Sequence, residues 1–206
     1  MSQICSEIHK IFNELPRHSF PFNKTTIPKN GIYIIFEKNE YAHGADRIVR
    51  IGTHTGEEQL FSRLQQHFVK ENKDRSIFRK NIGRALLNKE NDPFLEQWDW
   101  DLTTKEKKEK YLPLLNQAKQ KEVENSVSEY IQTNLSFCVI HVEGKEKRLE
   151  LESKIISTVS LCENCKPSEN WLGNFSPKRK IRESGLWLVN ELYKEPLEFA
   201  DLEIYK

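Results

Sequence analysis

Two short apolar runs, followed at once by an amphipathic helix, constrain the fold of this chain more than any other feature. The runs are GIYIIFE at 31–37 and RIVRIGTH at 47–54, and β-branched and aromatic residues, which favour strands, dominate both. A polar, glycine-containing segment joins them, so the pair predicts a β-hairpin. A helix is predicted over about 57–70, and Thr55 and Glu58 have the spacing of a capping box at its start.

The rest of the hydrophobic pattern predicts three more elements. They are an amphipathic helix over 2–14, a buried strand over 135–142 and a helix over 146–159. Together with the hairpin and its helix, they predict an α+β fold. We expect a small three-stranded mixed or antiparallel sheet flanked by helices.

Residues 71–134 differ in character from these elements. The segment is rich in lysine and glutamate and ends in a charged helix predicted over about 114–133. We interpret it as a largely helical insertion within a single elaborated domain that spans 1–206. The core of that domain is expected at about 28–70 and 135–195.

Composition excludes several classes of protein. The 206 residues are enough for one domain with a core, and a net charge of +1 gives no global field that would recruit nucleic acid. No apolar run approaches the roughly 20 residues of a membrane helix. The N-terminus, MSQICSEIHKIF, lacks the charged start and apolar stretch of a secretory signal. We therefore expect a cytoplasmic protein with no membrane contact.

The four cysteines do not predict a disulfide framework in a chain of this length. Cys162 and Cys165 form a single C-x-x-C with no histidine beside it, and Cys5 and Cys138 lie in unrelated segments. A structural zinc site needs about four ligands. Free thiols are therefore the expectation, and a structural metal is the alternative.

The hairpin and the helix carry characteristic residues in a characteristic order. Gly-Ile-Tyr occupies 31–33, Arg-Ile-Gly occupies 50–52, and Arg63 and His67 follow four residues apart. This arrangement resembles the GIY-YIG nuclease family, in which the second motif is normally Tyr-Ile-Gly. Arginine at that position, followed by Gly-Thr-His, is similar to an uncharacterised bacterial branch of the family. The resemblance covers roughly half of the chain and implies a metal-dependent endonuclease, a phosphodiester hydrolase that acts on DNA.

The resemblance implies roles for Tyr33, Arg50 and His54. In the family, the first-motif tyrosine helps to activate the water that attacks the phosphodiester, and Tyr33 matches it. Arg50 replaces the second tyrosine; a guanidinium cannot act as a base, but it can bind a phosphate oxygen bidentately. His54 titrates near neutrality and could supply the base. The alternatives are that Tyr33 is packed in a strand, that Arg50 faces solvent and that His54 only begins a turn.

Arg63 and His67 lie together at one edge of the apolar arc of their helix, where a core meets a cleft. An arginine there can stabilise the negative charge of a scissile phosphate. The alternative is a rim arginine beside a half-buried histidine. The family's last site residue is an asparagine after the final helix, which we place at Asn174, although Asn164 and Asn170 also qualify by position.

Glu152 falls near the middle of the apolar stripe of the helix predicted over 146–159. A carboxylate there is costly unless a cation, a hydrogen-bond donor or a raised pKa compensates. In the family, the glutamate of a Leu-Glu-x-x-hydrophobic pattern binds one divalent metal, and 151–155 fit that pattern. Mg²⁺, or Mn²⁺, suits a site with few carboxylates and several waters. The alternative is a structural ion pair between Glu152 and an arginine such as Arg63.

Clusters of basic residues could follow a nucleic-acid backbone, because neutralising phosphates needs local charge rather than net charge. The candidate residues are Arg75, Arg79, Lys80 and Arg84 in one segment and Lys178, Arg179, Lys180 and Arg182 in another.

The main hypothesis is thus a DNA endonuclease. Duplex, branched, damaged or single-stranded DNA, and RNA, all remain possible substrates. The rival interpretation is a catalytically degenerate module that binds nucleic acid or a protein partner without cleavage. Loss of the second tyrosine favours that rival.

Overall fold

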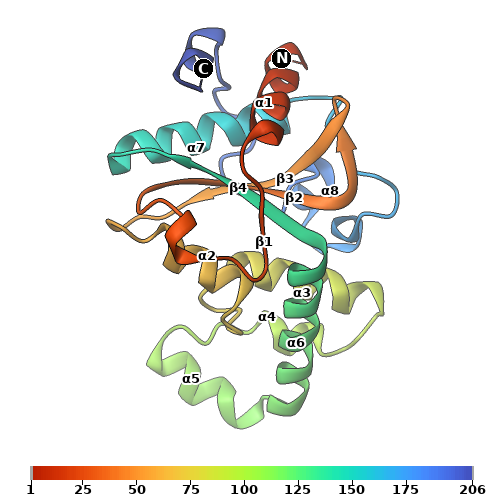
Figure 1. Ribbon diagram of the computed structural model, residues 1–206. Coiled ribbons are helices and arrows are strands. Elements are labelled where there is room, and N and C mark those ends of the chain that lie inside the picture. The colour runs from red at the N-terminus through yellow and green to blue at the C-terminus, as the bar shows by residue number, and fades with distance from the viewer. Residues whose placement is uncertain (1, 206) are drawn as a thin grey trace.

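The computed structural model describes residues 2–205, with side chains to residue 202, and has the expected α+β architecture. A four-stranded antiparallel sheet with the order β1-β4-β2-β3 lies between two groups of helices (Figure 1). The strands are β1 (His18–Ser19), β2 (Gly31–Ala42), β3 (Ala45–Thr53) and β4 (Leu135–His141). The very short β1, which pairs with β4, is the strand that the sequence pattern did not predict.

Helices cover both faces of the sheet. The α-helices are α1 (Ser2–Glu14), α2 (Leu60–Phe68), α3 (Ile77–Lys89), α4 (Leu95–Asp99), α5 (Lys105–Tyr111), α6 (Gln117–Asn134), α7 (Lys145–Ser160) and α8 (Arg179–Ser184). Short 3₁₀ segments occupy Lys24–Thr26, Leu112–Leu114, Leu172–Phe175 and Phe199–Tyr205. Helices α1 and α7 lie on one side of the sheet, and α2, α3 and α6 lie on the other (Figure 1). No helix in this described part of the chain is long and apolar enough to cross a membrane.

The hairpin is confirmed but is longer than its apolar runs. Both strands continue through the polar segment and meet at a two-residue turn, in which His43 has φ +54° and Gly44 has φ +75°. Two successive positive φ angles match the twist of the flanking strands. The polar segment is therefore mostly strand rather than loop.

The register of the hairpin fixes which side chains share a face. Tyr33 pairs with Gly52, and Ile35 pairs with Arg50. Tyr33 and Ile35 pack with apolar residues of α2 and α3, and the Arg50 guanidinium lies over the Phe78 ring of α3. Ile34 on the intervening position faces α1 and α7. The alternation therefore places both motif positions, Tyr33 and Arg50, on one side of the sheet.

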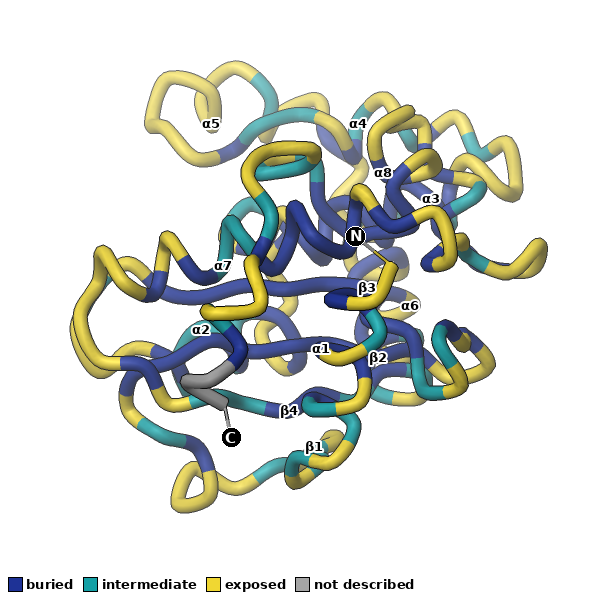
Figure 2. The backbone as a smooth tube through the Cα atoms, turned by 90° about the horizontal axis from the view of Figure 1, so that it is seen from above, coloured by how far each residue is buried: buried dark blue, intermediate teal, exposed yellow. Residues whose placement is uncertain are grey.

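Each face of the sheet has its own hydrophobic core. Tyr33 and Ile35 pack with apolar residues of α2, α3 and α6, whereas Ile32 and Ile34 pack with those of α1 and α7. Figure 2 shows the strands buried between these layers, while α5 is exposed. The sheet is thus buried on both faces.

The predicted elements outside the hairpin are largely confirmed, and their differences from the structure have local causes. Helix α2 begins at Leu60, later than predicted, because Glu58 has φ +54° and its amide donates to Asn30 Oδ1 at 2.8 Å. The predicted capping box is therefore wrong, and Gln59, the residue before the helix, makes no capping bond. The segment 71–134 is helical as expected, and its helix α3 packs into the core.

Candidate active site

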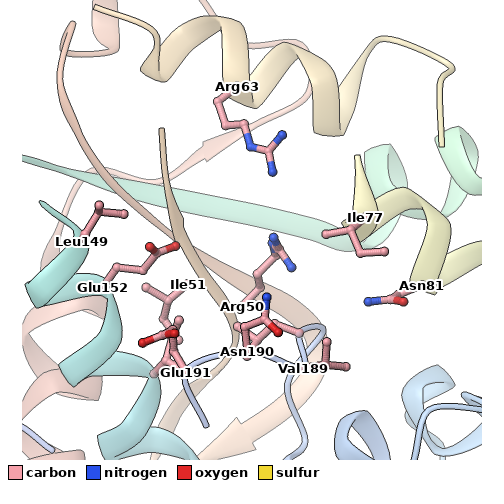
Figure 3. Close-up of a pocket in the computed structure, with 12 residues that line it drawn as sticks. Arg50, Ile51, Arg63, Ile77, Asn81, Leu149, Glu152, Val189, Asn190 and Glu191 are labelled. Atoms are coloured by element: carbon pink, nitrogen blue, oxygen red, sulfur yellow. The ribbon is translucent and has the colours of Figure 1, made fainter. Parts of the chain in front are cut away.

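A cleft with a volume of about 470 Å³ opens at the edge of the sheet beside β3 (Figure 3). Because β3 is an edge strand, α7 reaches the cleft from one face while α2 and α3 reach it from the other. The segment after α8 follows this edge, and the Trp187 amide donates to the Val49 carbonyl at 2.8 Å. The lining residues are Arg50, Ile51, Arg63, Ile77, Asn81, Leu149, Glu152, Ile156, Leu188, Val189, Asn190 and Glu191.

Arg50 lies at the base of this cleft and is only 6% exposed. Its NH1 donates to the Trp187 carbonyl at 2.5 Å, and its guanidinium lies 4.8 Å from the centre of the Phe78 ring. Its Nε atom is buried and has no hydrogen-bond partner within the described residues. A buried donor without a partner is costly, so this position favours an anionic or hydrogen-bond-accepting ligand.

Neither cleft arginine is neutralised by a nearby carboxylate. Arg63 donates to Gln66 Oε1 at 2.9 Å and to the Arg75 carbonyl at 3.2 Å, both uncharged acceptors. In the described part of the chain, no carboxylate lies within 4.0 Å of Arg50 or Arg63, whereas the other buried arginines each have one. Those arginines are Arg47, Arg79, Arg84 and Arg148. Among the buried arginines of the described chain, the one without a carboxylate partner is therefore Arg50, at the cleft.

Glu152 points into the same cleft from α7 (Figure 3). Its Oε1 accepts the backbone N–H of Thr53 at 3.0 Å, and no Arg63–Glu152 ion pair within 4.0 Å is present among the described residues. Burial raises the pKa of this carboxyl, against the opposing influence of Arg50, the Thr53 amide and Arg63. The carboxylate is thus partly desolvated, with lone pairs still available to a cation.

Two residues of the cleft wall, Asn190 and Glu191, were not predicted from the sequence. The Glu191 carboxylate accepts from Ser153 Oγ at 2.6 Å and from Lys194 Nζ at 2.8 Å, and Lys194 is the main reason that the pKa of Glu191 lies below its usual value. Its negative charge also raises the pKa of Glu152, which indicates that the two carboxyls are near each other. The signal in the sequence was a polar pair directly after the apolar run GLWLV.

Tyr33, His67 and Ser76 form a buried hydrogen-bonded chain on the α2–α3 side of the sheet. The Tyr33 hydroxyl lies 2.8 Å from His67 Nε2, and His67 Nδ1 lies 2.7 Å from Ser76 Oγ. Burial, with Arg50, Arg63 and Arg79 nearby, holds the pKa of His67 well below its ordinary value. The imidazole is therefore neutral, with one nitrogen that donates and one that accepts.

The same two arginines link this buried chain to the carboxylate. Arg50 and Arg63 line the cleft together with Glu152, and the Phe78 ring lies 4.8 Å from the Arg50 guanidinium and 5.4 Å from the His67 ring, centre to centre. Tyr33, Arg50, Arg63, His67 and Glu152 thus converge on one region of the structure.

His54 and Asn174 were predicted to belong to this site, but the structure does not bring them into it. His54 lines a neighbouring hollow that Arg63 also lines, but its Nδ1 lies 2.6 Å from the Gly56 carbonyl and its Nε2 accepts the Gly31 amide at 3.3 Å. Both ring nitrogens are engaged by the backbone, which disfavours His54 as a base. Asn174 donates to the carbonyls of Ser168 and Glu169 and does not line the cleft, where Asn190 lies instead.

The structure contradicts the predicted nucleic-acid contact for three of the four residues in the first basic cluster. Arg79 is fully buried and pairs with Glu124 at 2.8 Å, and Lys80 donates to the Asp99 carbonyl at 2.9 Å. Arg84 pairs with the Asp99 carboxylate at 2.5 Å. These side chains stabilise the packing of α3, so they cannot follow a nucleic-acid backbone.

The remaining basic candidates are on the surface. Arg75 is exposed, and its carbonyl accepts from Arg63. Lys178, Arg179, Lys180 and Arg182 are all exposed, and Lys180 Nζ lies 3.4 Å from the carbonyl of Val189, a cleft residue. The second cluster therefore lies beside the cleft.

The GIY-YIG domain family matches this sequence over residues 8–204, so the chain belongs to that family. Membership indicates a nuclease-type function, with nucleic acid as the substrate and, in general, a divalent metal requirement. The comparisons with curated proteins and with solved structures gave no significant match.

Proposed function

We propose that this protein is a metal-dependent endonuclease that hydrolyses DNA phosphodiester bonds in the cleft beside β3. The observation that carries the proposal is the pairing of two arginines that lack a carboxylate partner with a desolvated carboxylate across the same cleft. A phosphodiester brings negative oxygens that suit the arginines. The carboxylate suits the cation that such hydrolysis requires.

Arg50 and Arg63 bind the scissile phosphate in this mechanism. Both line the cleft, and Arg50 retains a buried donor without a partner among the described residues. A guanidinium stays protonated at any accessible pH and can donate two parallel hydrogen bonds to phosphate oxygens. The substitution of arginine for the second-motif tyrosine thus strengthens charge stabilisation where the charge of the transition state grows.

Glu152 is the residue that would hold the divalent ion, with Glu191 on the neighbouring wall. The donor set is oxygen only and contains few carboxylates, which fits Mg²⁺ or Mn²⁺ better than a softer metal. When bound, the ion supplies a Lewis acid for the phosphate and lowers the pKa of a bound water.

Tyr33 and His67 form a buried hydrogen-bonded pair behind the two cleft arginines. In the tautomer whose Nδ1–H donates to Ser76 Oγ, His67 Nε2 accepts a hydrogen bond from the Tyr33 hydroxyl. Neither side chain lines the cleft, and a protonated ring would lie among Arg50, Arg63 and Arg79, so His67 stays neutral and holds the Tyr33 hydroxyl in place without taking its proton. Ser76 keeps the imidazole in this orientation.

A second candidate function is nucleic-acid binding without cleavage. The observation that favours it is the packing of Arg50, whose NH1 already donates to the Trp187 carbonyl and whose charge lies over Phe78. In this case Arg50 would be a structural residue. The chain would then bind DNA through the cleft and the basic segment beside it.

The deciding experiment compares cleavage of supercoiled plasmid and branched DNA, with Mg²⁺ or Mn²⁺, by wild type, Glu152→Gln and Glu150→Gln. Glu150 is the matched control, because it is an exposed glutamate on the same helix that does not line the cleft. We expect cleavage by wild type and by Glu150→Gln, and a loss of about 100-fold or more for Glu152→Gln. DNA binding without cleavage by any of the three would instead support the second candidate.

A further inference from the structure

A cluster of two thiols and two imidazoles lies away from the cleft, on the α1–α7 side of the sheet. Its members are Cys5 in α1, His9 one turn later, His43 in the β2–β3 turn and Cys165 in the loop after α7. One ligand atom from each residue lies within 4.8 Å of all the others. Cys5 and the C-x-x-C lie in unrelated segments of the sequence, and folding brings Cys5 and Cys165, 160 positions apart, into contact.

Three distances within the cluster are close to those of a tetrahedral site. Cys5 Sγ and Cys165 Sγ are 3.3 Å apart, Cys165 Sγ and His43 Nε2 are 3.3 Å apart, and Cys165 Sγ and His9 Nε2 are 3.8 Å apart. With Zn–S of about 2.3 Å and Zn–N of about 2.0 Å, a tetrahedral site places two sulfurs roughly 3.8 Å apart and a sulfur and a nitrogen roughly 3.5 Å apart. The three distances differ from these values by at most about 0.5 Å, so small side-chain movements would complete the site. The two sulfurs are also too far apart for a disulfide, which needs about 2.05 Å.

The histidines are oriented as zinc ligands usually are. His9 Nδ1 lies 2.8 Å from the Cys5 carbonyl, and donation to that carbonyl leaves the lone pair of Nε2 for a metal. The Ile48 amide lies 3.3 Å from the same Nε2, so metal binding would displace this long contact. His43 is only half-buried, which gives a cation a route into an otherwise buried site.

Cys162 supplies a fifth donor nearby. Its sulfur lies 3.4 Å from His43 Nε2, and it begins the C-x-x-C turn that Cys165 ends. The backbone N–H of Asn164 donates to the Cys162 sulfur. Cys162 is therefore the alternative to His9 as the fourth ligand, and the two sets differ in the number of thiolates.

We propose that Cys5, His9, His43 and Cys165 bind one structural Zn²⁺. Sulfur and imidazole donors select zinc over the hard Mg²⁺ that suits the oxygen donors of the cleft. The ion would connect three separate parts of the chain, namely α1, the hairpin turn and the loop after α7. None of these residues lines the cleft, so the inference does not rest on the proposed nuclease function.

The test is the zinc content of protein purified without chelators or immobilised metal, measured by elemental mass spectrometry. We expect one zinc per chain in wild type, near-complete loss in Cys5→Ser and Cys165→Ser, and a lower Tm after chelation. Cys138→Ser is the matched control, since Cys138 is a fully buried free cysteine on β4 outside the cluster, and it should retain the zinc. Zinc-free wild type whose Tm does not respond to chelator or to added Zn²⁺ would overturn the site, as would a Cys5–Cys165 disulfide found by mass spectrometry.

The ligand set has its own test, which stays informative if a cysteine variant fails to fold. Co²⁺ in a tetrahedral site absorbs visible light, with a sulfur-to-metal band whose strength follows the number of thiolates. We expect His9→Ala to weaken Co²⁺ binding by at least tenfold and Cys162→Ser to leave the spectrum of two thiolates unchanged. The reverse pattern would overturn the proposed set in favour of three cysteines and His43.

Discussion

At the scale of single residues, His67 is the side chain whose surroundings most restrict its charge. It is fully buried, and Arg50, Arg63 and Arg79 add to burial in holding its pKa well below the ordinary value of 6.5. An imidazolium there would lie among three guanidinium groups with little water. The hydrogen bonds to Tyr33 and Ser76 are therefore made by a neutral ring.

This burial predicts a dependence of stability on pH. As the pH falls below about 6.5, the unfolded chain takes up a proton on His67 while the folded chain does not, so the free energy of unfolding decreases down to the folded pKa. Above that window the stability contribution is complete. We expect wild type to lose up to about 1.4 kcal/mol per pH unit more than His67→Gln between pH 6.5 and 5. Urea denaturation at several pH values measures this difference.

The exposed His141 provides the control for that experiment. His141→Gln should keep the pH dependence of wild type. If wild type and His67→Gln instead lose stability in parallel, His67 is not the group that stays neutral in the fold.

Single residues can be assigned to a site from the sequence only when the pattern that places them is local. Glu152 was identified because its place on a helical stripe is visible within a few turns of sequence. The burial of Arg79 was not, because its partner Glu124 lies 45 residues away, and a surface arginine and a paired core arginine look alike in sequence. The cysteine and histidine cluster was not predicted for the same reason, because its members are distant in sequence.

At the scale of elements, the hairpin depends on a close contact between its two motifs. The ring of Tyr33 lies against Gly52, where a Cβ atom would stand 2.1 Å from the tyrosine oxygen and 2.3 Å from Cζ. Gly52 is thus required for space rather than for backbone conformation. The register that pairs these two residues makes the tyrosine and the glycine of the motifs a single packing unit.

We therefore expect Gly52→Ala to lower the free energy of unfolding by about 1–3 kcal/mol, because the fully packed Tyr33 ring cannot move aside without breaking its bond to His67. Gly44→Asn is the control on the same hairpin. Gly44 has φ +75°, no atom lies within 4 Å of the position that a Cβ would occupy, and asparagine tolerates this turn. Urea denaturation should therefore give a near-neutral Gly44→Asn, and equal effects at both glycines would contradict the packing argument.

Elements were predicted well where hydrophobic periodicity alone decides them. Helices α1 and α7 and strand β4 follow their apolar patterns closely. The start of α2 was missed because Asn30, distant in sequence, captures the Glu58 amide that a capping box would have used. Termini that are fixed by tertiary contacts leave no local signal.

At the scale of the whole molecule, the fold separates two chemically different sites. The cleft beside β3 offers oxygen ligands and arginines, and the Cys5 cluster offers sulfur and imidazole ligands on the α1–α7 side. A chain with a net charge of +1 must also collect its positive surface locally in order to hold DNA over the cleft. The exposed segment at 178–182 is the candidate for that surface.

The last prediction compares two triple variants that remove equal charge. Lys178→Ala, Lys180→Ala and Arg182→Ala change the segment beside the cleft, whereas Lys105→Ala, Lys108→Ala and Lys110→Ala change exposed lysines of α5, and each set lowers the net charge of +1 by three. If 178–182 contacts phosphates, the slope of log Kobs against log salt should fall in magnitude by about 2–3 for the first set and hardly at all for the second. Fluorescence anisotropy with a labelled duplex across a salt series measures both slopes. Similar losses in both sets would mean that overall charge, rather than this surface, governs binding.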